Sequence, residues 1–221
     1  MCSRYFLDAD GNVIAYTFNV PVHERIRKRF NIAPTQEAPV VRVGDSGARE
    51  VALLRWGLVP SWAKDLSIGN KMINARSETA AEKPSFRNAL RRRRCLVPAS
   101  GFYEWTGEPG RKIPHAITVA DQPVFAFAGL WESWNDKSQP GAPPVETYTL
   151  LTTNANRALA AVHDRMPVIL AAADQERWLH ASPEEAAQLL RPYADDAMRE
   201  RVVSTRVNNP RNESEDLLQA S

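Results

Sequence analysis

The sequence predicts an α+β protein with a largely antiparallel sheet. Two observations support this fold class. Short apolar segments with strand composition outnumber the segments with helical spacing. Most of these strand-like segments are joined by links short enough to form hairpins. Closure of such a sheet into a barrel is compatible with the pattern.

Strands are expected where short apolar runs are bounded by turn residues. Residues 40–43 and 51–56 form one candidate hairpin, with a turn over residues 44–48. The remaining strands are expected over residues 95–98, 101–105, 113–119, 123–130, 145–152 and 202–207. The Pro- and Gly-bearing segment 131–144 is expected to be a loop.

Helical spacing and capping residues predict the helices. Residues 8–12 are expected to be a polar turn, and Ile26 and Phe30 share one face of a helix over residues 22–30. Ser182 and Glu185 form a capping box at the start of the last helix. The other helices are expected over residues 84–94, 155–162 and 173–180, and the last over residues 182–193.

Composition indicates an ordinary water-soluble protein. The 221 residues suit one domain over residues 1–221, with a polar tail from residue 210. The sequence contains no apolar run long enough for a membrane span and no secretory signal. With only two cysteines, a reducing cytoplasm is the expected location, with nucleoid association if the protein is bacterial. Cys2 and Cys95 provide neither a disulfide framework nor zinc-ligand spacing. Neither a metal nor a cofactor is expected.

Cys2 can acquire unusual chemistry at the N-terminus. Removal of Met1 would place a free α-amine and a thiol on adjacent carbons. The α-amine titrates near pKa ~7.7–8.0, so a useful fraction is neutral at pH 7. Together the two groups can trap an aldehyde as an imine and then as a five-membered thiazolidine. The alternative is that Cys2 belongs to a frayed terminus.

Arginines concentrate in one stretch although the net charge is only +2. Arg87, Arg91 and Arg94 share a face of the predicted helix and could bind phosphates. The alternative is a solvated charged face. Trp62 follows Pro60 and precedes a polar segment, so its indole is expected to be partly exposed and able to stack on a base.

Three further segments carry candidate polar groups. Asn74 and Arg76 alternate in an extended segment and would share one face, which suits the lining of a polar groove. Glu104 lies among aromatic residues, either as an edge residue or as a half-buried acid with a raised pKa. His163 precedes a turn enforced by Pro167, whereas the remaining histidines, including His115, lie in ordinary surface contexts.

Seven short motifs follow one another along the chain. They are MCxRY at residues 1–5, NIAP at 31–34, WGLVP at 56–60, NARSET at 74–79, RCLVP at 94–98, GFYEW at 101–105 and HDRMP at 163–167. In this order they resemble the SRAP family, the SOS-response-associated peptidase-like or abasic-site processing proteins. The segment VNN at 207–209 also resembles the family pattern, and the match extends to about residue 212.

The resemblance implies one SRAP domain, built on a β-barrel-like core with surrounding helices. It also implies binding of single-stranded DNA at abasic sites and a covalent crosslink through Cys2. In that scheme Asn74 would hold the sugar remnant, while Glu104 and His163 would move protons. Ser3 departs from the glycine that the family usually has at this position, so we expect a slightly different backbone approach to DNA here.

The arginines of two motifs would contact phosphates. Arg4 and Arg76 resemble the family's phosphate-contacting residues, and Arg165 is a weaker candidate. An imine intermediate also permits β-elimination, which would give an abasic-site lyase side activity. Two alternatives remain: a thiol peptidase that uses Cys2, His163 and Glu104, and a single-strand binder without catalysis. A monomer is expected.

Overall fold

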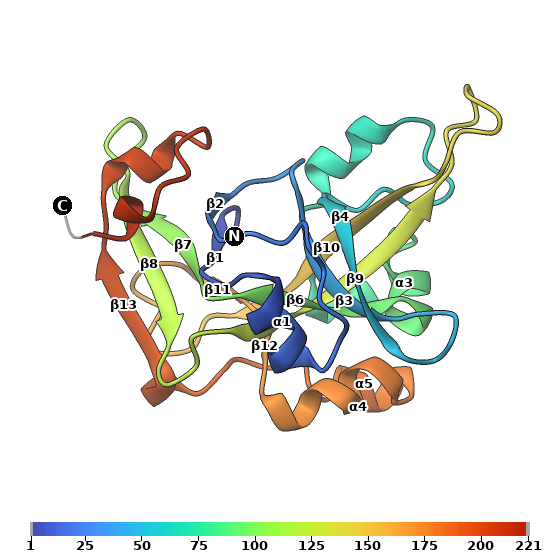
Figure 1. The fold of residues 1–221 in the computed structure, drawn as a ribbon. Coiled ribbons are helices and arrows are strands. Elements are labelled where there is room, and N and C mark those ends of the chain that lie inside the picture. The colour runs from blue at the N-terminus through green and yellow to red at the C-terminus, as the bar shows by residue number, and fades with distance from the viewer. Residues whose placement is uncertain (1, 220–221) are drawn as a thin grey trace.

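A computed structural model describes residues 2–219, in which a closed barrel lies beside an open sheet (Figure 1). The barrel closes because β10 pairs with β4 on one side and with β9 on the other. The ring of pairings runs β10–β4–β3–β6–β9–β10, and only the β10–β4 pairing is parallel. Its strands are β3 (Glu37–Val43), β4 (Arg49–Trp56), β6 (Arg94–Ala99), β9 (Phe125–Trp134) and β10 (Val145–Asn154). This confirms the predicted α+β class with a largely antiparallel, barrel-like core.

Three short strands extend the barrel sheet. The strand β5 (Asn74–Arg76) runs parallel to β10, further along the edge with which β4 pairs. The strand β11 (Arg165–Pro167) pairs with the end of β10, and β12 (Ile169–Leu170) pairs with β9. The strands β5 and β11 therefore lie on opposite edges of β10, with Asn74 opposite Leu150 and Arg165 opposite Asn154.

The open sheet has five antiparallel strands in the order β13–β8–β7–β1–β2. The strand β1 (Tyr5–Leu7) lies between β7 (Gly101–Thr106) and β2 (Arg29–Ile32). The other two strands are β8 (Ile113–Val119) and β13 (Met198–Val202). The N-terminal strand is thus paired on both sides.

Short helices cover the sheets. The α-helices are α1 (Gly11–Phe18), α2 (Ser77–Ala80), α3 (Arg87–Arg92), α4 (Gln175–His180) and α5 (Pro183–Ala187). The 3-10 helices are η1 (Leu66–Lys71), η2 (Ala172–Asp174), η3 (Asp195–Ala197), η4 (Thr205–Asn208) and η5 (Glu215–Leu218). Among residues 2–219, a helix with the length and apolar composition of a membrane span is not found.

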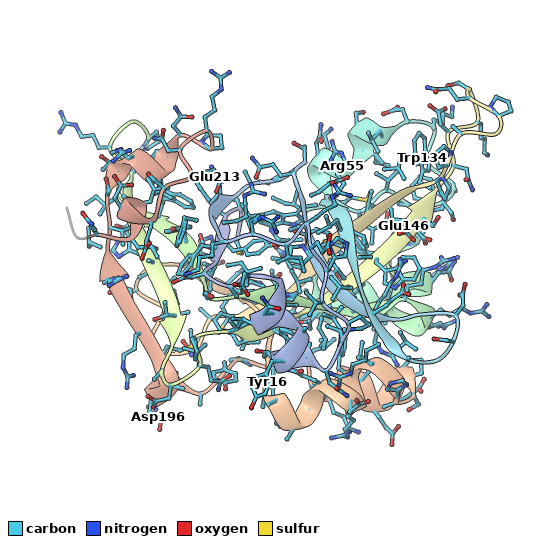
Figure 2. All side chains as sticks on the ribbon, viewed as in Figure 1. Tyr16, Arg55, Trp134, Glu146, Asp196 and Glu213 are labelled. Carbon is cyan, nitrogen blue, oxygen red and sulfur yellow. The ribbon has the colours of Figure 1, made fainter. Side chains whose placement is uncertain are left out.

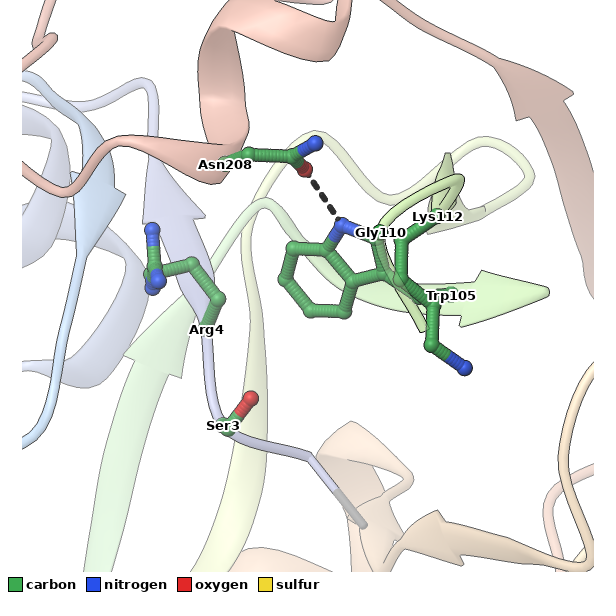
Figure 3. A pocket seen from close by; sticks show the side chains of 6 residues that line it. All are labelled: Ser3, Arg4, Trp105, Gly110, Lys112 and Asn208. Carbon is green, nitrogen blue, oxygen red and sulfur yellow. Dashed lines mark hydrogen bonds between the residues drawn. The ribbon is translucent and has the colours of Figure 1, made fainter. Parts of the chain in front are cut away.

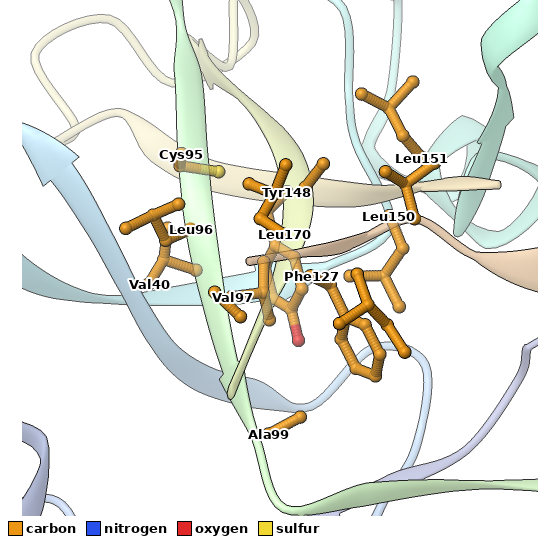
Figure 4. Packing of buried hydrophobic residues seen from close by; sticks show 14 of the residues in the cluster. Val40, Cys95, Leu96, Val97, Ala99, Phe127, Tyr148, Leu150, Leu151 and Leu170 are labelled. Atoms are coloured by element: carbon orange, nitrogen blue, oxygen red, sulfur yellow. The ribbon is translucent and has the colours of Figure 1, made fainter. Parts of the chain in front are cut away.

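Aromatic residues join the barrel to the N-terminal strand (Figure 4 shows part of this core). The Tyr5 ring lies edge-on to Trp56 at 5.2 Å and to Phe127 at 5.9 Å between ring centroids. Its hydroxyl is 2.7 Å from the hydroxyl of Tyr148. All four side chains are fully buried. Tyr5 therefore anchors the N-terminal strand in the barrel core and fixes the position of Cys2.

A second core holds the C-terminal segment against the open sheet. It contains Phe6, Phe30, Tyr103, Ala116, Val203, Val207 and Leu217. Asn31 is fully buried, and its Nδ2 donates to the carbonyl oxygens of Val207, Asn209 and Asn212 at 3.2, 3.0 and 2.8 Å. Glu213, labelled in Figure 2, accepts from Arg29 Nε at 3.0 Å. The segment after residue 203 is thus fastened to β2.

The helix predicted over residues 22–30 is wrong. Residues 29–32 form β2, since pairing with β1 places Ile32 opposite Tyr5. The helix instead begins at the predicted polar turn, because the Asp10 carboxylate accepts from the amides of Asn12 and Val13 and caps α1. Asn19 ends α1 in the left-handed conformation, with φ of 52°.

Other boundaries also differ from the predictions. Residues 157–162 form turns rather than a helix, because β10 continues through Thr153 to Asn154. The last strand is Met198–Val202, and residues 205–208 form η4. The strand β9 extends into the predicted loop as far as Trp134. The capping box of Ser182 and Glu185 is confirmed, but α5 ends at Ala187.

Candidate active site

Cys2 is fully buried at the entrance to β1. Asn74 Nδ2 donates to the Cys2 carbonyl oxygen at 2.6 Å, and the Cys2 thiol lies 3.7 Å from the carbonyl oxygen of Arg4. The sequence had left open a frayed terminus. The structure instead packs this cysteine beside the predicted groove residue Asn74.

Asn74 presents a second polar atom at the same place. Its Oδ1 is buried and accepts no hydrogen bond from residues 2–219. The bond from Nδ2 to Cys2 fixes the orientation of the amide, so Oδ1 is held ready for a donor. A buried acceptor without a donor costs about 1–3 kcal/mol. A ligand hydroxyl or amine could supply the missing hydrogen bond.

Glu104 reaches this region from β7. Tyr5 lies opposite Phe102 across the β1–β7 pair, and the Tyr103 amide donates to the Arg4 carbonyl at 2.9 Å. The same register places Glu104 opposite Ser3, next to Cys2. Burial raises the pKa of Glu104 to about 7, and the Asp164 carboxylate adds to the rise. This confirms the expectation of a buried acid, and such a group can accept or donate a proton near neutral pH.

The Cys2 thiol is kept protonated. Burial raises its pKa well above the ordinary range, and the negative charge of Glu104 raises it further. Reaction at sulfur therefore requires a base that removes the thiol proton. Glu104 is the nearby buried carboxyl group that could accept this proton.

His163 lies in the turn before β11, with about a quarter of its side chain exposed. The Arg165 amide donates to its Nδ1 at 2.9 Å, so Nδ1 acts as an acceptor. Asp164 Oδ1 also lies 2.8 Å from Nδ1, which would favour a protonated ring. We favour the neutral ring with its proton on Nε2, because the backbone donor is fixed, Asp164 is largely exposed and burial lowers the pKa of His163.

The predicted phosphate-binding arginines occupy different environments. Arg76 is exposed, and its guanidinium makes no hydrogen bond or ion pair with residues 2–219. Arg4 Nη1 donates to Asn31 Oδ1 at 2.8 Å and to the Val207 carbonyl at 2.9 Å. Arg165 is buried, and its guanidinium binds both carboxylate oxygens of Glu78 at 2.6 and 2.8 Å. Of these three, Arg76 is the one free to meet a ligand.

The remaining candidates lie on other elements of the fold. Arg87 and Arg91 are exposed on α3, which lies across the barrel from β1 in Figure 1. Arg94, predicted on their helix face, is buried as the first residue of β6. Trp62 is 53% exposed, as predicted, and lines a pocket with Lys64 and Lys71. Trp56 is fully buried.

A pocket beside the N-terminal segment was not predicted from the sequence. Ser3, Arg4, Trp105, Gly110, Lys112 and Asn208 line it (Figure 3). Trp105 Nε1 donates to Asn208 Oδ1 at 2.6 Å, and the Arg4 guanidinium lies 5.8 Å from the Trp105 ring centre. Alternation along β7 could have suggested that Trp105 points to the face opposite Glu104. No local sequence pattern indicated that Asn208 would line this pocket.

The fold and the site together define a barrel protein in which a buried cysteine near the N-terminus lies beside a buried acid and an asparagine, with a histidine in the turn before β11. A family model for the SOS response associated peptidase (SRAP) matches residues 1–210. The chain belongs to this family. This confirms the resemblance seen in the sequence motifs.

Relatives and solved structures agree with this assignment. The abasic site processing protein YoqW of Bacillus subtilis is 42% identical over 228 residues, with 100% of each chain covered. The abasic site processing protein HMCES of Gallus gallus is 32% identical, covering 88% of this chain and 66% of the relative. A crystal structure from Bacteroides thetaiotaomicron has a TM-score of 0.86 at 28% identity, with full coverage of both chains. One from Bordetella bronchiseptica has a TM-score of 0.78 at 28% identity, covering 92% of this chain and 100% of the other.

Proposed function

We propose that this chain is an abasic-site processing protein that binds single-stranded DNA and forms a covalent thiazolidine through Cys2 after removal of Met1. The observation that carries the proposal is the burial of Cys2 against Asn74 and near Glu104. The names of the relatives point to the same substrate.

The reaction joins both groups of Cys2 to the aldehyde of a ring-opened abasic site. The α-amine attacks C1′, and the carbinolamine loses water to give an imine. The thiol then adds to the same carbon, while its proton moves to the nitrogen through a nearby base. Glu104 is suited to these transfers because its pKa lies near neutrality. His163 would protonate the ring oxygen as the sugar opens.

Asn74 would hold the sugar remnant. Its Oδ1 is buried without a donor from residues 2–219, so it can accept a hydrogen bond from a sugar hydroxyl or from the thiazolidine nitrogen. The imine also allows β-elimination of the 3′ phosphate, which would produce a lyase side activity. Crosslinking, however, keeps the damaged strand attached to the protein.

The DNA backbone would pass the exposed groups around the site. Arg76 is free to pair with a phosphate, and Trp62 can stack on a base. Arg4 borders the pocket of Figure 3, although two of its hydrogen bonds hold the protein itself. Arg87 and Arg91 would contact only a longer strand, and Arg165 is the least suited because Glu78 binds it.

A denaturing gel tests the proposal. The processed protein is mixed with single-stranded DNA that carries one abasic site, beside Cys2→Ala, a form that keeps Met1, and Cys95→Ala as a control at the other buried cysteine. We expect a shifted band from the processed wild type and from Cys95→Ala only. A shorter DNA product in the same lanes would report the lyase activity.

The same gel separates the alternatives. A thiol peptidase needs only the sulfur, whereas the crosslinker needs the amine and the sulfur together. A band that persists in the form keeping Met1 would contradict the role of the α-amine. No band from folded protein with a verified free Cys2 would overturn the crosslinking proposal and direct attention to peptide cleavage.

A further inference from the structure

His115 lies directly opposite Glu104 across the β7–β8 pair. Directly paired residues of antiparallel strands point to the same face, with Cβ atoms about 4.5–5.5 Å apart. The imidazole and the Glu104 carboxylate therefore begin from neighbouring positions on one face. The sequence placed His115 in an ordinary surface context, but only 12% of its side chain is exposed.

Both ring nitrogens of His115 have polar partners. Nε2 lies 2.7 Å from Thr106 Oγ1, and Nδ1 contacts a carboxylate oxygen of Glu200. Thr106 lies two residues beyond Glu104 on β7, and Glu200 lies on the edge strand β13. A hydroxyl can donate or accept, so this arrangement satisfies the ring in either protonation state.

The three strands thus carry a polar row that runs outward from the buried acid. Glu104 is only 4% exposed, whereas 35% of the Glu200 side chain is exposed at the sheet edge. The N-terminal amine lowers the pKa of Glu104, and Asp164 and Cys2 are the other ionisable groups that act on it. His115 lies opposite Glu104 in the register of β7 and β8, and its ring contacts Glu200 on β13.

The proposed reaction releases a proton that has to reach solvent, and a row of polar side chains could conduct it. An α-amine that starts as an ammonium must release one proton before it attacks the aldehyde, and water is the other product. Glu104 can accept that proton, but bound DNA would cover the open side of the site. Continued transfer by Glu104 then requires that it pass the proton to solvent by another route.

We propose that His115, oriented by Thr106 and Glu200, relays protons between Glu104 and solvent while DNA occupies the site. It is a positioning residue because it acts through Glu104. This inference rests on the proposed function. A histidine suits the role because it gains and loses a proton near neutral pH. A small adjustment of either side chain, or one bridging water, would join the paired positions.

The test measures crosslinking rate and DNA affinity separately. The variants are His115→Phe, which keeps an aromatic ring, and Glu200→Gln, which interrupts the outer end of the row. His180→Phe, at the half-exposed end of α4, is the matched control. Rates are followed from pH 5 to 9 with saturating abasic DNA, and affinity is measured with DNA carrying a tetrahydrofuran analogue that has no aldehyde.

We expect both variants to bind the analogue within about twofold of wild type. We expect their crosslinking rates to fall about tenfold and their pH profiles to change, with His180→Phe unchanged. Wild-type rates and pH profiles in folded Glu200→Gln and His115→Phe would overturn the inference and leave the proposed function intact. Failure of the wild type to crosslink would overturn both, so the two failures are distinguishable.

Discussion

The barrel and the open sheet differ in how their strands are paired and in the kinds of side chain that they carry. The barrel closes on itself, so its strands leave few unpaired edges, and large apolar side chains fill it. The open sheet carries Glu104 and His115 on one face and depends on the C-terminal segment to cover the other. The larger hydrophobic core lies in the barrel, whereas the polar candidates come from both sheets: Glu104 from the open sheet, and Asn74 and His163 from the edges of the barrel sheet.

The largest loss of stability is expected in the barrel. Trp56→Ala removes a fully buried indole that contacts Tyr5 and donates to the Ile73 carbonyl at 2.8 Å. The free energy of unfolding should fall by about 3–5 kcal/mol. Denaturant titration measures it, with Trp62→Ala as a control because Trp62 is half exposed. Equal losses at the two tryptophans would contradict the comparison.

Glu104→Gln should stabilise the protein at high pH. The pKa of Glu104 rises from 4.5 to about 7 on folding, so ionisation favours the unfolded state as pH rises between these values. Gln removes that effect. The variant should match wild type near pH 4 and exceed it near pH 8, by on the order of 3 kcal/mol. Melting curves across this range check the sign, and exposed Glu108→Gln is the control.

Asn31→Ala should loosen the open sheet rather than the barrel. The buried Asn31 side chain donates through Nδ2 to three carbonyl oxygens of the C-terminal segment, and its Oδ1 accepts a hydrogen bond from Arg4. We expect a loss of about 1–3 kcal/mol, because buried polar groups lose their partners. Hydrogen exchange should rise over residues 204–218 and stay low in β6 and β9. A uniform rise, or a similar effect of exposed Asn88→Ala, would count against this assignment.

The smallest expected effect is at the start of α1. Asp10→Ala removes the carboxylate that caps the amides of Asn12 and Val13. Stability should fall by about 1 kcal/mol. Thermal unfolding measures the change, and Asp45→Ala in the exposed β3–β4 turn is the comparison. Equal losses of unfolding free energy in the two variants would show that the cap makes no measurable contribution to stability.

Local patterns predicted the barrel strands better than the segments whose conformation depends on distant partners. The hairpin of β3 and β4 follows from apolar runs around a Gly-bearing turn. The spacing of Ile26 and Phe30 indicated a helix, but Phe30 lies in β2 because this segment pairs with β1. The cap at Asp10 was visible in the sequence and was interpreted as a turn.

In the candidate site, too, features set by local sequence were predicted better than features set by contacts between distant residues. Burial raises the pKa of Glu104, and the apolar composition of the segment around it indicated from the sequence that this acid could be buried. The contact between Asn74 and Cys2 joins residues 72 positions apart and depends on how β5 lies along β10. The position of His115 opposite Glu104 depends on one hairpin register, which the Gly-rich turn between the strands did not specify.

The late position of β10 in the chain has a consequence during synthesis. Asn74 is held by pairing with β10, whose last residue is Asn154, and Arg4 is held by the carbonyl of Val207. A ribosome delivers Cys2 first and these partners much later. We therefore expect the nascent N-terminus to stay accessible to the enzyme that removes Met1 until the pocket can assemble. Refolded protein that still carries Met1 should be trimmed more slowly by added methionine aminopeptidase than the same chain in denaturant-weakened form, as mass spectrometry would show.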